Sequence, residues 1–407
     1  MAAARGGTGT NQEAVRRHNL GTLLGHVHVG GELSRAELTG RMGLNRSTIA
    51  GLVAELESLG LIEQASPAAG RRTAGRPSAG VRVPDDGPYV IAVDLGVDKV
   101  EVARVGLGGR LRERAGAPIP QDTEAWQVGA TVAALIRHVV SVSPAGAPLL
   151  GIGIAVPALV RRGDGLVRHA PNLGWHDVSF GSIVLAALSL DVPITVGNDA
   201  DLGALAEHRR GAAVGIDDLV YISGNVGVGA GVITGGVGLG GAAGYAGEIG
   251  HLCFTPGGIR CHCGSDGCWE TVVGAHAIAQ AIRLPAEQAA RLGEVLDDVS
   301  VQPRELRPIA ADLGRGLAAV VNAFNPSIVI LGGYFRPLFR LMRSEVTAGL
   351  AERALRANYE SVRLTLPGLG SDSVLHGAAE MALEPVFVDP VASLGTAITD
   401  APSRLAG

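Results

Sequence analysis

The sequence predicts a mixed α/β protein in which a small winged helix-turn-helix domain precedes a larger α/β domain made of two strand-rich halves. Three observations support this prediction. A helix, a short helix and a longer helix follow one another near the start, a turn-rich break follows at Pro84–Pro88, and strands alternate with helices beyond it. A chain of 407 residues suits two or three domains, and we place the first boundary at residue 84.

The composition is that of a globular protein with an uneven distribution of charge. Apolar residues make up 47% of the chain, and 60 glycines indicate many tight turns. Up to Pro84 the chain carries ten Arg and six Glu, a net charge of +4, whereas the remainder carries −9. A basic excess at one end favours nucleic acid as a partner, although ordinary surface charge would also produce it.

The sequence contains no stretch typical of a signal peptide or a membrane span. The longest apolar run, Leu149–Val160, is too short and is interrupted by a proline. All four cysteines lie between residues 253 and 268, which suits metal ligation in a reducing compartment better than a disulfide framework. We therefore expect a cytoplasmic protein with no membrane partner.

The N-terminal segment contains three helix patterns. Apolar residues at helical spacing predict a first helix over 11–27. Ser34 and Glu37 form a capping box that starts a short second helix. Asn45 can cap a third helix over 45–60, which has one apolar stripe and a polar first turn.

This order of helices is the helix-turn-helix layout, in which the last helix enters the major groove of DNA. Leu61–Glu63 then predicts a strand, and residues 71–83 predict the loop and return strand of a wing. A three-helix oligomerisation module is the alternative. We predict double-stranded operator DNA as the partner, contacted by Ser34, Arg35, Asn45, Arg46, Ser47, Thr48, Arg71, Arg72 and Arg76.

The larger domain is predicted from strands that end in acidic or glycine-rich turns. Residues 89–119 contain two or three strands, with Asp94-Leu95-Gly96 at the first turn. Leu149–Val160 is a buried strand, and a later strand ends at Asn198-Asp199. Residues 218–236 predict a strand pair with a glycine-rich bend. Two such halves with a cleft between them are typical of a nucleotide-binding fold.

A cluster of thiols and one imidazole predicts a metal site. His251, Cys261, Cys263 and Cys268 are soft ligands that favour tetrahedral Zn²⁺, and four protein ligands leave no position for water. The site is therefore predicted to be structural. We expect the remaining Cys253 to be a small buried apolar side chain. The alternative is a reduced loop without metal.

These motifs together resemble the ROK family (repressors, open reading frames and sugar kinases), in its repressor branch with an N-terminal winged helix. The resemblance extends from Val90 to about Ala379 and includes the family's zinc signature at 247–270. It implies the two-lobed, actin-like (ribonuclease-H-like) fold of the sugar kinases. The implied lobes are 85–200 and 201–369, with residues of about 370–390 packing back on the first.

The resemblance also implies a sugar site at the cleft between the lobes. Sugar hydroxyls require closely spaced donors and acceptors, which carboxylate, amide and imidazole groups supply. His251 would contact both sugar and metal through its two ring nitrogens. In the kinases the counterpart of Asp199 is the general base. The implied sugar-binding residues are Asn172, Asn198, Asp199, Glu248, His251 and Glu270.

The phosphate-binding turns of the kinases are altered in this sequence. The first kinase turn reads Asp-x-Gly-Gly-Thr-Lys, and here Val97 and Asp98 replace its second glycine and threonine. Val97 adds bulk where the backbone should approach phosphate, and Asp98 adds negative charge. The second, Gly-Thr-Gly, stands here as Asn225-Val226-Gly227. We therefore expect that no residue acts in catalysis, although Asp199 corresponds to the general base of the kinases.

The sequence thus predicts a transcriptional regulator, in the first instance a repressor, whose degenerate sugar-kinase domain senses a sugar or sugar derivative. Sugar would favour one closure angle of the lobes and so change the spacing of two winged helices in a homodimer or homotetramer. The sequence leaves open whether the sugar releases or strengthens DNA binding. Two alternatives remain: an active ATP-dependent sugar kinase with a DNA-binding arm, and a regulator that responds to a partner protein.

Overall fold

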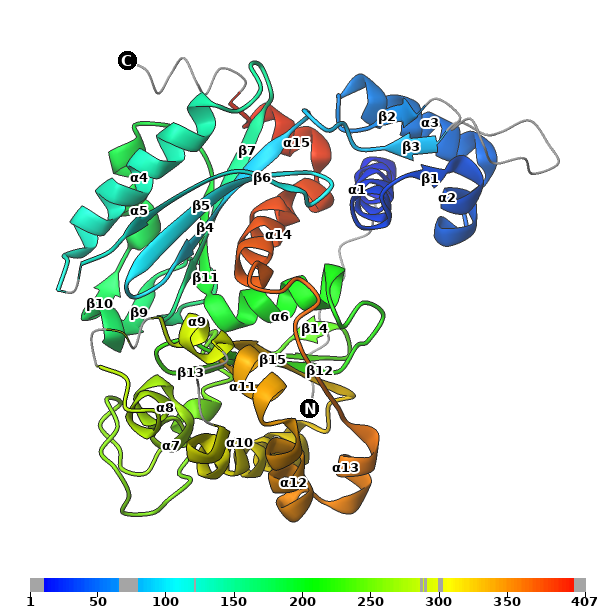
Figure 1. Cartoon of the computed structure of the whole chain (residues 1–407). Coiled ribbons are helices and arrows are strands. Elements are labelled where there is room, and N and C mark those ends of the chain that lie inside the picture. Colours follow the sequence, from blue (N-terminus) through cyan, green and yellow to red (C-terminus); the bar gives the residue numbers. More distant parts are fainter. Residues whose placement is uncertain are drawn as a thin grey trace, which may run out of the picture.

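The computed structural model describes residues 11–65, 80–120, 122–285, 288, 291–298 and 303–398. In these ranges a small helical domain lies beside two α/β lobes (Figure 1). A five-stranded sheet forms the centre of each lobe, and a three-stranded sheet belongs to the N-terminal domain. Among the helices of the described ranges, none is long and apolar enough to cross a membrane.

The N-terminal domain has the predicted order of elements. Its helices and strands are α1 (Gln12–Gly30), β1 (Leu33–Ser34), α2 (Arg35–Met42), α3 (Arg46–Ser58), β2 (Glu63–Ala65) and β3 (Gly80–Arg82), and the strands pair in the order β1-β3-β2. The capping box is confirmed: the amide of Glu37 donates to Ser34 Oγ at 3.1 Å, and the amide of Ser34 donates to the Glu37 carboxylate at 2.8 Å.

The first lobe is built on a sheet that is covered on both faces. Its strands are β4 (Tyr89–Leu95), β5 (Lys99–Gly106), β6 (Leu111–Pro118), β7 (Leu149–Val156) and β11 (Ile194–Asn198), in the order β11-β7-β4-β5-β6. β4, β5 and β6 are antiparallel neighbours, whereas β7 runs parallel to β4 and β11. Every residue of β7 is buried, as expected for a strand with helices on both faces.

Helices α4 (Ala125–Ser141) and α5 (Phe180–Leu188) cover one face of this sheet, and α14 (Ser373–Val388) covers the other. A second, small sheet extends the lobe toward the other lobe. It consists of β8 (Leu159–Val160), β9 (Val167–Ala170) and β10 (Trp175–Val178), with the 3-10 turn η1 (Pro171–Leu173) between the last two.

The second lobe repeats the strand pattern of the first. Its strands are β12 (Leu219–Gly224), β13 (Val228–Thr234), β14 (Val237–Gly238), β15 (Ile328–Gly333) and β16 (Arg363–Thr365), in the order β14-β13-β12-β15-β16. Three antiparallel strands are again followed by two parallel ones. The predicted strand pair over 218–236 is therefore confirmed as β12 and β13.

Short helices and one long helix surround the second sheet. They are η2 (Ile249–His251), α7 (Glu270–Val273), α8 (Ala275–Ala281), α9 (Leu292–Asp297), α10 (Pro303–Phe324), α11 (Phe335–Leu341), α12 (Arg343–Arg353) and α13 (Arg356–Ser361). The indole of Trp269 lies in the core against α10, where its Nε1 donates to the carbonyl of Asp312 at 3.2 Å. The cysteine-rich loop before α7 is thereby anchored in this core.

Two helices lie between the lobes. α6 (Asp199–Arg210) packs on β12 and β13 and also against α14, which lies on the sheet of the first lobe (Figure 1). The boundary expected between residues 200 and 201 falls inside α6, because Asn198 caps one continuous helix there. α1 and α15 (Pro390–Gly395) contact each other and α14, so the N-terminal domain joins the first lobe through α14.

Candidate functional site

The predicted metal ligands lie together in the second lobe. One ligand atom from each of His251, Cys261, Cys263 and Cys268 can be chosen so that all four lie within 4.8 Å of one another. His251 Nδ1 is 3.6 Å from Cys261 Sγ, and Cys263 Sγ is 3.6 Å from Cys268 Sγ. A tetrahedral site with metal–sulfur bonds of about 2.3 Å requires sulfur atoms about 3.8 Å apart. The donor set and its spacing therefore fit a tetrahedral metal ion.

Backbone geometry brings these ligands together. Cys253 and Cys268 form an isolated β-bridge, and a tight turn follows Cys261, whose amide donates to the carbonyl of Ser265 at 2.8 Å. Gly267 has φ of +72°, and a Cβ there would lie 1.7 Å from the carbonyl oxygen of Thr255. The loop therefore requires glycine at this position.

Cys253 itself is exposed, so the prediction that it is buried was wrong. Its backbone pairs with Cys268 while its side chain is left outside the cluster. The cysteine set is thus divided into three grouped thiols and one that is separate.

The two acidic residues that flank the loop contact its histidine. His251 Nε2 is 3.8 Å from the Glu248 carboxylate, and His251 Nδ1 is 3.8 Å from the Glu270 carboxylate. The Cys261 thiol also lies 3.0 Å from Glu270 Oε1. Because Nδ1 lies beside the thiols, Nε2 is the ring nitrogen directed toward Glu248. The two nitrogens of His251 thus face different carboxylates.

Asp199 contributes a carboxylate from the start of α6. Its side chain is only 7% exposed, and Oδ1 accepts a hydrogen bond from the amide of Ala200 at 2.9 Å. Burial raises the pKa of Asp199 to about 6, although hydrogen bonds from Ala200 and Asn225 act in the opposite direction. Asn198 caps the same helix, and its Nδ2 donates to the carbonyl of Ala158 at 3.1 Å. Most of the hydrogen-bonding capacity of Asn198 is therefore used within the fold.

The turn between β12 and β13 connects the acidic groups. Asn225 Nδ2 donates to Asp199 Oδ2 at 3.1 Å, and the amide of Val228 donates to Glu270 Oε2 at 3.3 Å. A Cβ at Gly227 would lie 2.6 Å from Glu270 Oε2, so the backbone of the turn lies close to this carboxylate. The turn predicted as an altered phosphate loop is thus bonded to two of the predicted sugar-binding carboxylates.

The first altered turn lies at the end of β4. The amide of Gly96 donates to the carbonyl of Lys99 at 2.8 Å, and Asp98 is exposed. Burial, followed by the negative charge of Asp199, raises the pKa of Asp94 to about 7. Asp94 matches the first residue of the kinase motif, so Asp98 is the acidic side chain that this turn adds.

The candidate DNA-contacting residues lie at the starts of α2 and α3. Asn45 accepts hydrogen bonds from the amide of Thr48 at 2.9 Å and from Ser47 Oγ at 2.7 Å. Arg46 is the first residue of α3 and is exposed. Polar groups therefore surround the first turn of the third helix. Arg71, Arg72 and Arg76 lie outside the described residues.

Comparison with known proteins decides the family. The sequence pattern of the ROK family matches residues 90–384. The chain belongs to the ROK family. A pattern of the MarR family matches residues 21–72, which include α2 and α3. The predicted fold class, a winged helix-turn-helix domain before an actin-like ROK domain, is confirmed.

Individual relatives differ in how much of the chain they match. The xylose repressor of Caldicellulosiruptor bescii is 29% identical over 385 residues, 88% of this chain and 93% of its own. The glucokinase of Streptomyces coelicolor is 28% identical over 323 residues, 74% of this chain and 98% of its own. The crystal structure of a ROK family regulator, described as a homologue of the E. coli MLC protein, has a TM-score of 0.73 at 24% identity and covers 97% of this chain and 100% of that chain. Because this structure covers 97% of the chain, the shared fold includes the N-terminal domain.

Within the ROK domain, five of the six predicted sugar-binding residues are connected. The contacts of Asp199, Glu248, His251 and Glu270 form one group around the β12–β13 turn, and Asn198 caps the helix that holds Asp199. Asn172 is exposed on η1, and no hydrogen bond or ion pair in the described ranges joins it to the others.

The prediction missed two charged residues beside this group. Burial, then the charges of Asp199 and Glu248, raise the pKa of Asp201 to about 7, while Arg162 opposes this shift. Both residues line a cavity of about 390 Å³ next to Asn198. Asp201 could have been found from its place in the same helical turn as Asp199. Arg162 could not, because it lies in a different loop.

Proposed function

We propose that this ROK protein is a transcriptional repressor that binds operator DNA through its winged helix and binds a sugar in its kinase-like domain. One observation most strongly supports the proposal that the kinase-like domain binds a sugar without phosphorylating it. The Asn225 side chain donates to the Asp199 carboxylate, in a turn whose kinase counterpart holds phosphate. The site therefore keeps acidic groups for hydroxyls and presents an amide where a phosphoryl group would approach.

We assign zinc to His251, Cys261, Cys263 and Cys268, in a structural role. Three thiols and an imidazole favour zinc over the hard cations, which prefer oxygen. Zinc bound by four protein ligands would fix the conformation of the loop. It would have no open coordination position at which a reaction could occur. His251 would then be held with Nε2 toward Glu248, and Glu270 would be held between the loop and the β12–β13 turn.

The effector is a sugar or sugar derivative held by Asp199, Glu248, His251 and Glu270. Carboxylates accept hydrogen bonds from adjacent hydroxyls, and an imidazole nitrogen completes the set. Asn172 and Asn198 would contribute from the first lobe once the lobes close. The xylose repressor relative makes a pentose the first candidate.

The DNA interface is assigned to α3 in the major groove of a palindromic operator. Arg46, Ser47 and Thr48 stand in the first turn of α3 and would contact bases or phosphates. Ser34, Arg35 and Asn45 would contact the backbone, and Arg71, Arg72 and Arg76 would form the wing contacts. A homodimer or homotetramer supplies two such helices.

An active sugar kinase is the second candidate, because Asp199 is retained and a glucokinase is among the relatives. A third is a regulator that responds to a partner protein and no longer binds a sugar. The kinase candidate is tested by measuring ADP release with an aldose and ATP. Release at ordinary enzymatic rates of about 1–10³ s⁻¹ would make the protein a kinase.

The deciding experiment is a thermal-shift screen of the purified protein with D-xylose, D-glucose, N-acetyl-D-glucosamine and their phosphorylated forms. Ligand at 100 times its Kd stabilises the native state by about 2.7 kcal/mol, which gives a measurable rise in Tm. A rise with at least one sugar, followed by a change in operator affinity, supports the proposal. No rise with any sugar would leave the partner-protein alternative.

A further inference from the structure

Helix α6 extends from the sugar site to the N-terminal domain. Asp199 is in its first turn, and Arg209 and Arg210 are its last two residues. At 1.5 Å per residue, about 16 Å separates the two ends of the helix. Because α6 lies on the second lobe and against α14 of the first, closure of the lobes would move it relative to α14.

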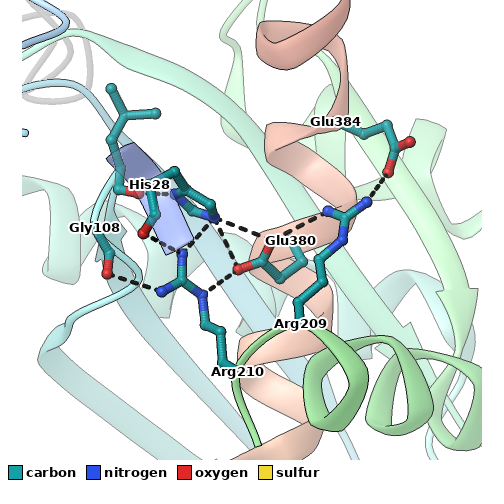
Figure 2. A network of polar contacts seen from close by, with 7 residues as sticks. His28, Gly108, Arg209, Arg210, Glu380 and Glu384 are labelled. Atoms are coloured by element: carbon teal, nitrogen blue, oxygen red, sulfur yellow. Dashed lines mark hydrogen bonds and ion pairs between the residues drawn. The ribbon is translucent and has the colours of Figure 1, made fainter. Parts of the chain in front are cut away.

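The end of α6 far from the sugar site carries a buried ionic cluster with α14. Glu380 of α14 is about 2% exposed and accepts hydrogen bonds from Arg209 at 3.1 Å and from Arg210 Nε (Figure 2). Arg209 also donates to Glu384 at 2.9 Å, one turn further along α14. Burial alone would raise the pKa of Glu380, but His28 and Arg210 outweigh it and the pKa is lowered. The carboxylate is therefore ionised between the two cations.

The same cluster includes the end of α1. His28 is 2% exposed, and its Nδ1 donates to the carbonyl of Leu107. Its Nε2 lies 3.0 Å from Glu380 Oε1 and also contacts Arg210 Nη2, which donates to the carbonyl of His28 at 3.1 Å. Burial lowers the pKa of His28, although the hydrogen bond and the charge of Glu380 act in the opposite direction.

Arg210 is thus the residue common to four elements. Besides α6, it contacts α14 through Glu380, α1 through His28, and the β5–β6 turn through the carbonyl of Gly108 at 3.1 Å (Figure 2). Its planar guanidinium presents several donors in fixed directions, so these contacts depend on the relative positions of the elements. A shift of α6 against α14 cannot occur without changing at least one of them.

Close packing joins α1 to α14 beyond the ionic cluster. A Cβ at Gly21 would lie 1.8 Å from the carbonyl oxygen of Phe387, so the helices touch at the backbone. The His28 and Phe387 rings are 4.6 Å apart. Leu20, Leu24 and other residues of α1 belong to a core that also contains α14 residues and the apolar side chains of α3. α1 therefore connects the ionic cluster to α3, the helix proposed to contact DNA.

Ionic groups are a costly way to fill a buried interface. Replacement of a buried ion-pair network by apolar side chains is often neutral or stabilising, whereas loss of one partner is strongly destabilising. Stability alone therefore does not account for two arginines around one carboxylate. A cluster that depends on geometry is suited to distinguish two arrangements of the helices that it joins.

We propose that Arg209, Arg210, Glu380 and His28 form the junction that transmits sugar binding to the winged helix. The inference rests on the proposed function, because it assumes that sugar and operator binding are coupled. Sugar held by Asp199 moves α6, the arginines move with its end, and Glu380 and His28 pass the displacement to α14 and α1. These four are positioning residues, since none of them contacts the acidic group of the sugar site.

The test compares Glu380→Gln with Glu384→Gln in the full-length protein. Both changes remove one negative charge from α14, but Glu384 is 58% exposed and, among the described residues, its ion pair is with Arg209 alone. Operator affinity is measured on a duplex selected by this protein from a random library, with and without the sugar that gives the largest thermal shift among D-xylose, D-glucose and N-acetyl-D-glucosamine. Coupling of two sites in proteins typically changes affinity by roughly 5- to 150-fold.

The measured quantity is the ratio of the operator Kd with sugar to the operator Kd without sugar. We expect Glu380→Gln to reduce the change in this ratio to below about 2-fold, while the Kd for the sugar changes by less than about 3-fold. Glu384→Gln should keep the ratio of the native protein. Arg210→Lys, which keeps the charge but loses the planar fork, should resemble Glu380→Gln and serves if that variant fails to fold. An unchanged ratio in the folded variants would overturn the inference.

A second measurement needs no sugar and separates this inference from the proposed function. Hydrogen exchange of the sugar-free, DNA-free protein is followed at the C-terminal turns of α1 and α6. Glu380→Gln should raise exchange there at least about 10-fold, because the junction holds both helix ends. Equal exchange in this variant and in Glu384→Gln would overturn the junction, even if the native protein responds to a sugar. Raised exchange without any sugar response would instead refute the proposed function.

Discussion

The proposed sugar side and the proposed phosphate side of the ROK domain differ in how closely they match the kinases. On the sugar side, Glu248, His251 and Glu270 are in contact and lie against a complete set of metal ligands. On the phosphate side, Asp98 adds charge and Asn225 uses its side chain to hold Asp199. The two sides belong to one ROK domain, and we propose that this domain keeps sugar recognition while its phosphate site is altered. The difference supports sugar sensing without phosphoryl transfer.

The largest effect is expected from the metal ligands. Cys263→Ser removes one of three thiols and should lower metal affinity by more than the roughly 10- to 100-fold typical of a supporting residue. Sugar affinity should fall with it, because the loop holds both His251 and Glu270. Metal content is measured by elemental analysis and sugar binding by calorimetry.

Cys253→Ser is the matched control, since this thiol is exposed and lies outside the cluster. It should leave metal content and sugar affinity unchanged. Loss of metal from Cys263→Ser with native sugar affinity would show that the metal does not support the sugar side.

A smaller effect is expected from Glu270→Gln. Hydrogen bonds to charged groups contribute about 1.5–3 kcal/mol, so the change should weaken sugar binding by roughly 10- to 100-fold. Glu294→Gln is the control, because Glu294 is 69% exposed and pairs with Arg291. Equal sugar affinities of the two variants, measured by calorimetry, would remove Glu270 from the site.

The phosphate side is tested by Asn225→Gly. This change removes one neutral donor from Asp199, which corresponds to about 0.5–1.5 kcal/mol and a roughly 2- to 10-fold weaker affinity for the sugar. Combined with Val97→Gly, Asp98→Thr and Val226→Thr, it should also restore detectable binding of ATP in a fluorescence titration. If the native chain binds ATP as tightly as the combined variant, the proposed difference between the two sides is wrong.

The smallest effect concerns pH and Asp94. Its folded pKa of about 7 lies above its ordinary value, so the folded protein binds more protons than the unfolded one. The free energy of unfolding therefore contains a contribution that falls as the pH rises toward about 7. Asp94→Asn should flatten the dependence of Tm on pH between 5 and 8 by about 1–3 °C per pH unit. Parallel Tm curves for the two proteins would contradict the raised pKa.

The sequence was sufficient for features that depend on local spacing. The capping box at Ser34 and the four metal ligands are separated by few residues, and the chemistry of each residue type limits what it can do. The acidic residues at the two ends of the cysteine-rich loop were found for the same reason, and their proposed role is what the family resemblance implies.

The contacts that spacing could not predict join distant segments. Asn225 bonds to Asp199 at the start of α6, 26 residues away in the sequence, and His28, Arg210 and Glu380 meet although they lie in three different parts of the chain. The exposure of Cys253 also depends on the direction of a side chain at an isolated bridge. Such features require the three-dimensional arrangement of the lobes.

We propose that the protein senses the sugar and does not phosphorylate it. Fluorescence anisotropy of a labelled operator duplex tests it most directly, with native protein, the sugar found in the thermal-shift screen, and no ATP. Sugar alone is expected to change operator affinity by roughly 5- to 150-fold, in the range of typical coupling between sites. An operator affinity that is unchanged by sugar and changes only when ATP is added and hydrolysed would contradict it.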